Sequence, residues 1–207
     1  MELTREMMPP WVRTVDAKVV AGTVPGTWTV TFRTQAVPGT LAAFAGTLAV
    51  ARLDILSALV RLTESDTVTD TFEIVPLDGA PFGPAQGDHL SARAAAVLNG
   101  RSDLVSQLGA LRRRYPPQTG VPLRVETNTD SSLTTGVNVV CANRPGLLYD
   151  ITSVLTAHGL RTRSLAVLTF NKQAHDTFRV VDSAGNPPRH SEQLAALRAD
   201  LTGACAE

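Results

Sequence analysis

The sequence of 207 residues predicts an α+β fold made of two copies of one small module. The first observation is an internal repeat: Pro38-Gly39 matches Pro145-Gly146 at a shift of 107 residues, and Asp70-Thr71-Phe72 matches Asp176-Thr177-Phe178 at a shift of 106. The matches keep their order over about fifty residues, and a one-residue difference in a hairpin loop accounts for the change of register. The second observation is that both copies show the same order of strand and helix patterns.

Each copy starts with a short run rich in β-branched residues and then turns into a helix. The runs are Thr27–Thr34 and Thr135–Cys141, and each leads to a Pro-Gly pair. Proline suits the first turn of a helix because its missing N–H has no intrahelical acceptor there, and glycine permits a tight turn. Apolar residues then recur at helical spacing. They are Leu41, Phe44 and Leu48 in the first copy and Leu147, Leu148, Ile151, Val154 and Leu155 in the second.

Two further strands and a second helix complete each copy. In the first copy we expect strands at Asp54–Leu62 and Thr67–Val75 and a helix at His89–Leu98. The corresponding segments of the second copy are Arg161–Phe170, Ala174–Val181 and Ser191–Leu201. The short loops between consecutive strands predict antiparallel pairing. Each module is therefore expected to be an antiparallel sheet with helices on one face.

A four-stranded ferredoxin-like (βαββαβ) sheet needs one more strand in each module, and none follows the last helix. Two β-rich runs are available: Trp11–Val20 before the first module and Val121–Thr127 before the second. Each run could complete the module that it precedes, or the two could be exchanged, and the sequence leaves both arrangements open. We divide the chain into a leader that adds a strand to a module sheet (1–24), a first module (25–100), a connector helix (101–120) and a second module with its leading strand (121–207).

The composition argues against several classes of function. Lys plus Arg equals Asp plus Glu, 19 each, so the chain lacks the basic balance of a protein that binds nucleic acid or a membrane surface. The run Arg112-Arg113-Arg114 falls where the connector helix should end, and cations there suit the helix dipole. Without a signal peptide or an apolar run of about 18 residues, we expect a cytoplasmic protein. Cys141 and Cys205 have neither disulfide-framework nor zinc spacing.

Residues for catalysis are not grouped in the sequence, and we expect no catalytic activity, metal or cofactor. His175 and Asp176 are neighbours on a strand, so their side chains point to opposite faces. The repeated Asp70 and Asp176 lack a partner carboxylate for acid/base work, and a role in a turn or bulge is the simpler interpretation. There is no phosphate-binding glycine motif and no serine elbow.

The Pro-Gly corners are the remaining candidate for a site. The first helical turn after each corner has backbone N–H groups without intrahelical acceptors, and with the helix dipole they suit a small anion. An α-amino acid could place its carboxylate on these amides and its ammonium on strand carbonyls. The alternative is that Pro-Gly only starts a helix, and physical reasoning leaves the two interpretations open.

Three stretches resemble a known family: RPGLLYDITSVLTAHGL (Arg144–Leu160), DTFRVVDSAG (Asp176–Gly185) and the connector AVLNGRSDLVSQLGALRRR (Ala96–Arg114). They are similar to ACT domains, small ferredoxin-like regulatory modules, and most similar to the tandem ACT pair at the C-terminus of bacterial protein-PII uridylyltransferases. The resemblance covers roughly Thr27 to Leu201 and implies a non-catalytic regulatory module of nitrogen metabolism that binds an amino acid, such as glutamine.

The resemblance also implies a binding site and partners. The expected site residues are Asn143, Arg144, Pro145, Gly146, Leu147 and Leu148, completed by Thr162, Arg163 and Ser164, with Pro38, Gly39 and Thr40 as a weaker equivalent corner. Exposed edge strands predict side-by-side association of modules into one extended sheet, within the chain or in a homodimer. A structural module that docks on a partner enzyme is the alternative function.

The sequence departs from the family at the corners. Family corners usually read Asp-Arg-Pro-Gly, whereas the second corner begins with Asn143 and the first with Ala36 and Val37. The loss of both polar residues at the first corner argues against a ligand there. The catalytic domains of the uridylyltransferase have no counterpart before Thr27, so the chain is either a free-standing tandem-ACT protein or an excised sensor fragment, and its leader favours the first.

Overall fold

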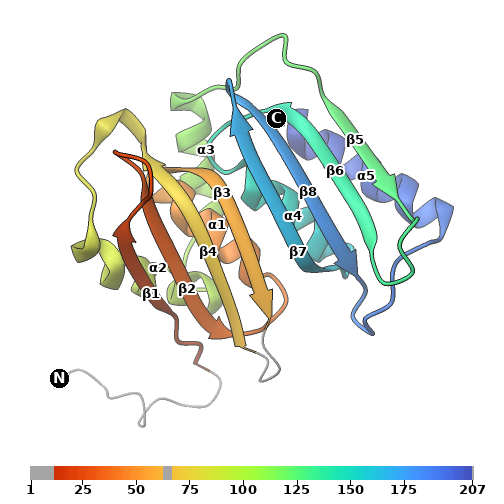
Figure 1. The fold of residues 1–207 in the computed structure, drawn as a ribbon, viewed down its shortest axis with the longest axis horizontal. Coiled ribbons are helices and arrows are strands. Elements are labelled where there is room, and N and C mark those ends of the chain that lie inside the picture. Colours follow the sequence, from red (N-terminus) through yellow and green to blue (C-terminus); the bar gives the residue numbers. More distant parts are fainter. Residues whose placement is uncertain (1–11, 63–66, 207) are drawn as a thin grey trace.

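The chain folds into two α+β modules that lie side by side (Figure 1). This is a computed structural model that describes residues 12–62 and 67–206, so part of the leader and part of the segment where the repeat changes register lie outside the described residues. The first module contains β1 (Asp16–Ala21), β2 (Trp28–Gln35), α1 (Thr40–Val50), β3 (Leu53–Leu62), β4 (Thr67–Pro76) and α2 (Gly87–Leu98). After α3 (Leu104–Arg114), the second module contains β5 (Arg124–Asn128), β6 (Thr135–Ala142), α4 (Leu147–Ala157), β7 (Arg161–Phe170), β8 (Gln173–Val181) and α5 (Ser191–Ala206).

Each module has one four-stranded antiparallel sheet, with strand orders β1-β2-β4-β3 and β5-β6-β8-β7. Together with the helices on one face, this confirms the predicted fold class. β1 pairs with β2, and β5 pairs with β6, so each leading strand completes the sheet of the module that it precedes. In a βαββαβ module the outer strand beside the first comes last in the chain, whereas here it comes first.

Apolar side chains on the helix-covered face of each sheet form the core. Along β2 the side chains alternate, and Val30 and Phe32 are completely buried. Phe32 stacks on Phe44 of α1 with ring centroids 4.5 Å apart, and it meets Phe72 of β4 edge-on at 6.0 Å. The repeat-equivalent buried positions in the second module are Val139, Ile151 and Phe178.

Helix α1 is apolar on all sides because other elements surround it. It contacts α2, α3, α4 and β3, and most of its residues are buried. Gly46 makes this close packing possible, since a Cβ there would lie 2.6 Å from Leu104 Cδ1 and 2.8 Å from Tyr149 Cδ2. Leu104 belongs to α3 and Tyr149 to α4, so the connector helix and the second module both rest on α1.

The two modules meet edge to edge along β3 and β7, which are the outer strands of their sheets. The strands run in opposite directions, and the Thr169 hydroxyl near the end of β7 donates to the Ile55 carbonyl near the start of β3 at 3.2 Å. The predicted side-by-side association of modules thus occurs within the chain. The described strands nevertheless form two separate sheets rather than one extended sheet.

Truncating Val19 on β1 should destabilise the protein, because its side chain is only 5% exposed and packs in the core. We expect Val19→Ala to lower the free energy of unfolding by about 1–3 kcal/mol through lost apolar contacts. The neighbouring Val20, 41% exposed, is a matched control that should change it by less than about 0.5 kcal/mol. Denaturant titrations of the two variants measure this, and equal losses would contradict a strand with one buried face.

Candidate functional site

Two corners, one in each module, lie at opposite ends of the seam between β3 and β7. The first corner is Ala36–Leu41, which leads into α1, and the second corner is Asn143–Leu148, which leads into α4. The second corner faces Leu53–Ile55 at the start of β3, and the first corner faces Leu160–Thr162 at the start of β7. Each corner therefore forms a site together with the other module, and the antiparallel seam relates the two sites by an approximate two-fold axis.

The two corners share one backbone conformation. Gly39 and Gly146 have φ values of 81° and 85°, in the left-handed region that disfavours residues with a side chain. The next amide turns back in each case: Thr40 N donates to Val37 O at 3.2 Å and Leu147 N to Arg144 O at 3.1 Å. Neither helix start has a side-chain cap, so the following first-turn amides are available to a ligand.

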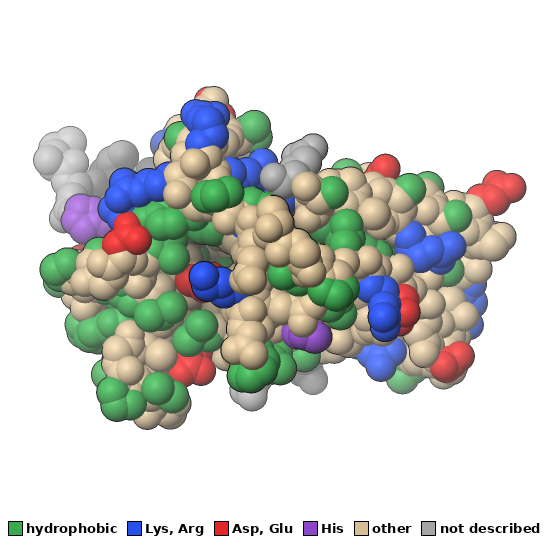
Figure 2. Space-filling view, turned by 90° about the horizontal axis from the view of Figure 1, so that it is seen from above, with side chains coloured by type: hydrophobic (Ala, Val, Ile, Leu, Met, Phe, Trp, Pro, Cys, Tyr) green, Lys and Arg blue, Asp and Glu red, His purple; other side chains and the backbone are tan. Residues whose placement is uncertain are grey.

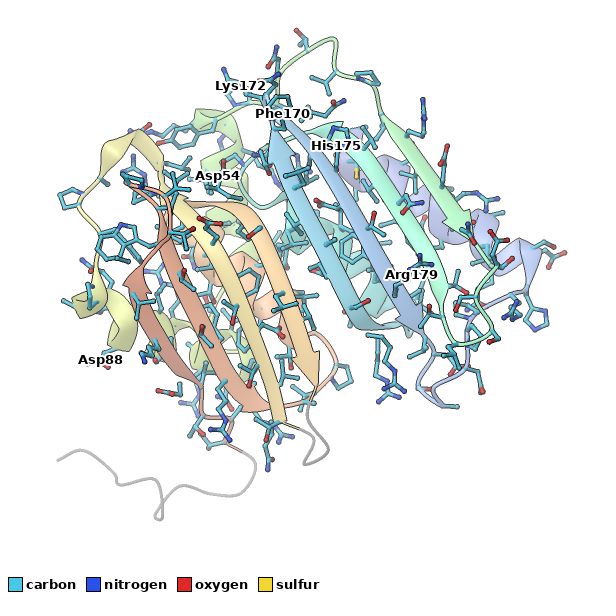
Figure 3. The ribbon with its side chains drawn as sticks, viewed as in Figure 1. Asp54, Asp88, Phe170, Lys172, His175 and Arg179 are labelled. Atoms are coloured by element: carbon cyan, nitrogen blue, oxygen red, sulfur yellow. The ribbon has the colours of Figure 1, made fainter. Side chains whose placement is uncertain are left out.

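The second corner is closed by its own polar side chains. Asn143 Nδ2 donates to both carboxylate oxygens of Asp54, at 3.1 and 3.2 Å, and so ties the two modules together. Burial raises the pKa of Asp54, and the hydrogen bond from Asn143 opposes that effect. Asp54 lies at the end of the molecule that also carries the β7–β8 hairpin tip with Phe170 and Lys172 (Figure 3).

Arg144 fills the second corner from the other side. Its guanidinium is buried and donates to the Asp150 carboxylate and to the Ala204 carbonyl, each at 2.6 Å. Asp150 also pairs with Arg112 of α3, which joins the corner to the connector helix. The space that remains at this corner is only about 20 Å³, close to the room for one water molecule.

A buried carboxylate lies beneath each corner. Asp176 of β8 is 3% exposed and lines the second-corner hollow, and its repeat equivalent Asp70 of β4 is fully buried and lines the hollow at the first corner. Burial raises the pKa of Asp176 to about 7, and a hydrogen bond from the Leu168 amide acts in the opposite direction. Asp176 Oδ1 has no hydrogen-bond partner among the described residues.

The first corner, in contrast, encloses a hollow of about 380 Å³. By repeat equivalence, Ala36 and Val37 stand where the second corner has Asn143 and Arg144, and Arg161 stands where the other site has Asp54. Alanine and valine are too short to cross the seam, so the space stays open. The hollow is lined by Ala36, Val37, Pro38, Gly39, Thr40 and Leu41, by Val60, Val68 and Asp70, by Thr152, Leu155 and Thr156, and by Leu160, Arg161, Thr162 and Ser183.

The residues expected from the sequence are divided between these two sites. Ala142, beside the second corner, pairs with Gln173, whereas Thr162 pairs with Val180. Seven strand residues, or about 23 Å, therefore separate Thr162 from the second corner. Thr162 lines the first-corner hollow instead, together with Pro38, Gly39 and Thr40. Arg163 and Ser164 are exposed on β7 and line neither hollow.

Sequence reasoning missed the residues that the seam brings to the corners. Asp54 and Arg161 occupy equivalent repeat positions, and a position that changes from acid to base between two copies is a signal that could have been noticed. Asp70 and Asp176 were noticed as a repeated pair within predicted strands, but they were assigned a role in a turn or bulge. Both lie inside strands, as expected, and beneath the corners.

Other kinds of site find little support in the described part of the chain. No group of three or more His, Cys, Asp or Glu side chains there could hold a metal ion, and none of its helices has the length and apolarity to cross a bilayer. Cys141 and Cys205 are buried free thiols. Basic and acidic side chains are interspersed with hydrophobic ones over the end of the molecule seen in Figure 2.

No family model matches the chain, but individual proteins do. The chain is 32% identical over 177 residues to the bifunctional uridylyltransferase/uridylyl-removing enzyme of Azospirillum brasilense. The aligned region covers 82% of the chain and 19% of that enzyme. The same enzyme of Gluconobacter oxydans is 31% identical over 170 residues, 79% of the chain and 18% of the enzyme. That of Streptomyces coelicolor is 33% identical over 170 residues, 77% of the chain and 20% of the enzyme.

The predicted resemblance is thus confirmed as homology to a segment of these enzymes. The chain spans about a fifth of the length of the curated relatives that it matches.

The pKa of Asp176 predicts a pH-dependent contribution to stability. Because its folded pKa of about 7 exceeds the ordinary 3.8, the folded state holds this proton over that range, and stability from this group falls as pH rises from about 4 to 7. In Asp176→Asn this dependence is absent, so the unfolding free energy of the variant minus that of the parent should rise by roughly 2–4 kcal/mol between pH 4 and pH 8. Denaturant titrations across pH measure it, and a pH-independent difference would contradict the assignment.

Removing the Asn143 amide should weaken the closure of the second corner. Asn143→Ala leaves the Asp54 carboxylate desolvated without its side-chain donor, and we expect a loss of about 1–3 kcal/mol in unfolding free energy. The double variant Asn143→Ala/Asp54→Ala removes both partners and should recover part of that loss. A double-mutant cycle of chemical unfolding tests this coupling, and strictly additive effects would refute it.

Proposed function

We propose that the chain is a non-catalytic, cytoplasmic regulatory module that binds an α-amino acid in the first-corner hollow between its two modules. The observation that carries the proposal is the hollow itself. Its volume of about 380 Å³ falls in the range of small-molecule sites, and it lies at a domain interface, where such sites are common. The homology to a segment of the uridylyltransferase/uridylyl-removing enzymes supports a regulatory role.

The hollow offers opposite polarity to the two charged groups of an amino acid. The buried carboxyl group of Asp70 provides oxygen acceptors for the α-ammonium group. The first-turn amides of α1 and the guanidinium of Arg161 provide donors and positive charge for the α-carboxylate. Arg161 Nη2 already donates to the Ser183 carbonyl at 2.9 Å, which holds the side chain at the edge of the hollow.

The second corner has a supporting role in this proposal. Asn143 binds Asp54 across the seam, and Arg144 binds Asp150 and the Ala204 carbonyl within the second module. Together they leave room for about one water molecule. The expected ligand site at Asn143–Leu148 would require these bonds to open. We therefore assign the ligand to the first corner, and the second corner holds the modules in register.

The regulated activity follows only from the relatives. They are named as bifunctional uridylyltransferase/uridylyl-removing enzymes, so we propose that amino-acid binding here controls an enzyme of that class, in the same polypeptide or as a partner. A docking or dimerisation role is the second candidate function. The exposed apolar side chains of Leu168 and Phe170 on β7, which are 58% and 65% exposed, favour it.

Isothermal titration calorimetry with each of the twenty amino acids tests the proposal. We expect at least one to bind, and Asp70→Asn should weaken it by about 10- to 100-fold, because the neutral amide loses the charge-assisted contact with the ammonium group. Arg161→Ala, at an exposed position, is a second variant that should also weaken binding.

The repeat supplies the control, since Asp176→Asn makes the same change beneath the second corner and should leave affinity unchanged. Thermal melts confirm that each variant is folded. If no amino acid produces heat with the folded parent protein at millimolar concentration, amino-acid binding is refuted and the docking role is favoured. If Asp176→Asn rather than Asp70→Asn weakens binding, the ligand belongs to the second corner.

A further inference from the structure

We infer that the first-corner hollow selects an amino acid with an aliphatic side chain (leucine, isoleucine or valine) over glutamine. This inference rests on the proposed function, because it concerns the side chain of the amino acid bound there. The inference follows from the aliphatic side chains that line the hollow away from Asp70 and Arg161. Glutamine is the ligand that the family resemblance suggests, so the two can be separated by experiment.

Aliphatic side chains from separate elements line the hollow. They come from the first turn of α1, from β3 and β4, from α4, and from the residue before β7. Leu155 and Leu160 are buried, and the other three are partly exposed, as expected for side chains that border an open space. The five residues are Leu41, Val60, Val68, Leu155 and Leu160. A ligand methylene placed among them gains apolar burial, which corresponds to a roughly fourfold gain in affinity per CH₂ group.

Three of the hydroxyl groups in the lining are already engaged with backbone carbonyls. Thr152 Oγ1 donates to Leu148 O at 2.6 Å, and Thr156 Oγ1 donates to Thr152 O at 2.8 Å, both within α4. Thr40 Oγ1 donates to Val37 O at 2.7 Å. Of the remaining hydroxyls, that of Ser183 lies by the carboxylate end of the ligand, because Arg161 donates to the Ser183 carbonyl, and that of Thr162 lies at the start of β7.

The hydroxyls of Thr40, Thr152 and Thr156 have already donated their protons, so they offer no donor to the carbonyl oxygen of a carboxamide, and that oxygen would lose its hydrogen bonds to water. No Asn, Gln, His, Lys or Glu side chain is among the described residues that line the hollow. Burial of an unsatisfied amide group weakens binding by roughly 5- to 150-fold. Apolar burial strengthens binding of an aliphatic side chain, and the unsatisfied carboxamide weakens binding of glutamine. Both effects act in the same direction and predict at least a tenfold preference for the aliphatic side chain.

The second corner shows what a different lining does. Val68 is replaced there by Ala174, and Thr152 and Thr156 by Ala45 and Ala49. Despite these smaller residues the second hollow is nearly filled, because Asn143 and Arg144 occupy it. Val60 has a direct counterpart in Val167, which provides a matched control position.

Calorimetric competition between leucine, isoleucine, valine and glutamine on the full chain at neutral pH tests the inference. We expect the best of the three aliphatic amino acids to have a dissociation constant at least tenfold lower than that of glutamine. Binding of glutamine with equal or higher affinity would overturn the inference and leave the proposed function intact. Absence of heat with every amino acid would overturn both.

Isosteric variants test the side-chain contact independently. Val68→Thr adds one hydroxyl to the lining and should weaken binding of the aliphatic ligand by about 3- to 10-fold, while the affinity for glutamine stays the same or rises. Val60→Thr is the alternative if Val68→Thr does not fold, as judged by circular dichroism. Val167→Thr, the matched change beside the second corner, should alter neither affinity. Equal weakening of both ligands by Val68→Thr would contradict contact between this residue and the ligand side chain.

Discussion

The packing of β3 against β7, with α1 on α4, is the contact on which the other features depend. Each corner faces a strand of the other module, so neither hollow would exist in an isolated module. The contact needs a helix with little bulk, and Gly46 and the alanines of α1 provide it. Because the two modules bury a common set of apolar side chains, the seam is part of the core and keeps the hollow in shape.

Three pairs of equivalent positions decide which hollow stays open. Asn143, Arg144 and Asp54 at one end of the seam correspond to Ala36, Val37 and Arg161 at the other. In the first set Asn143 binds Asp54 across the seam, while Arg144 is held by Asp150 and the Ala204 carbonyl, so this end of the seam is closed. The second set leaves one guanidinium at the edge of an apolar space, which favours occupation by a ligand that brings its own carboxylate.

The repeat, the strands and the helices could be predicted from the sequence because local patterns encode them: alternation in β2, the apolar stripe of α4, and Pro-Gly before each helix. The site was only partly predictable, since its residues meet through the seam. Asn143 reaches Asp54 across 89 residues of sequence, and Thr162 belongs to the other corner because β7 starts at the far end of its sheet. Polar residues at the second corner suggested ligand binding, but in the folded chain Asn143 binds Asp54, and Arg144 binds Asp150 and the Ala204 carbonyl.

The approximate two-fold axis of the seam has a consequence for how specificity can diverge. In a symmetric homodimer of single modules, each substitution at a corner appears at both sites, so the two sites remain identical. Joining the modules in one polypeptide removes that restriction, because each corner is then encoded separately and can be substituted independently. One end of the seam is closed by hydrogen bonds between the modules, and the other end encloses an open hollow. Self-association of identical subunits does not allow the two ends to differ in this way.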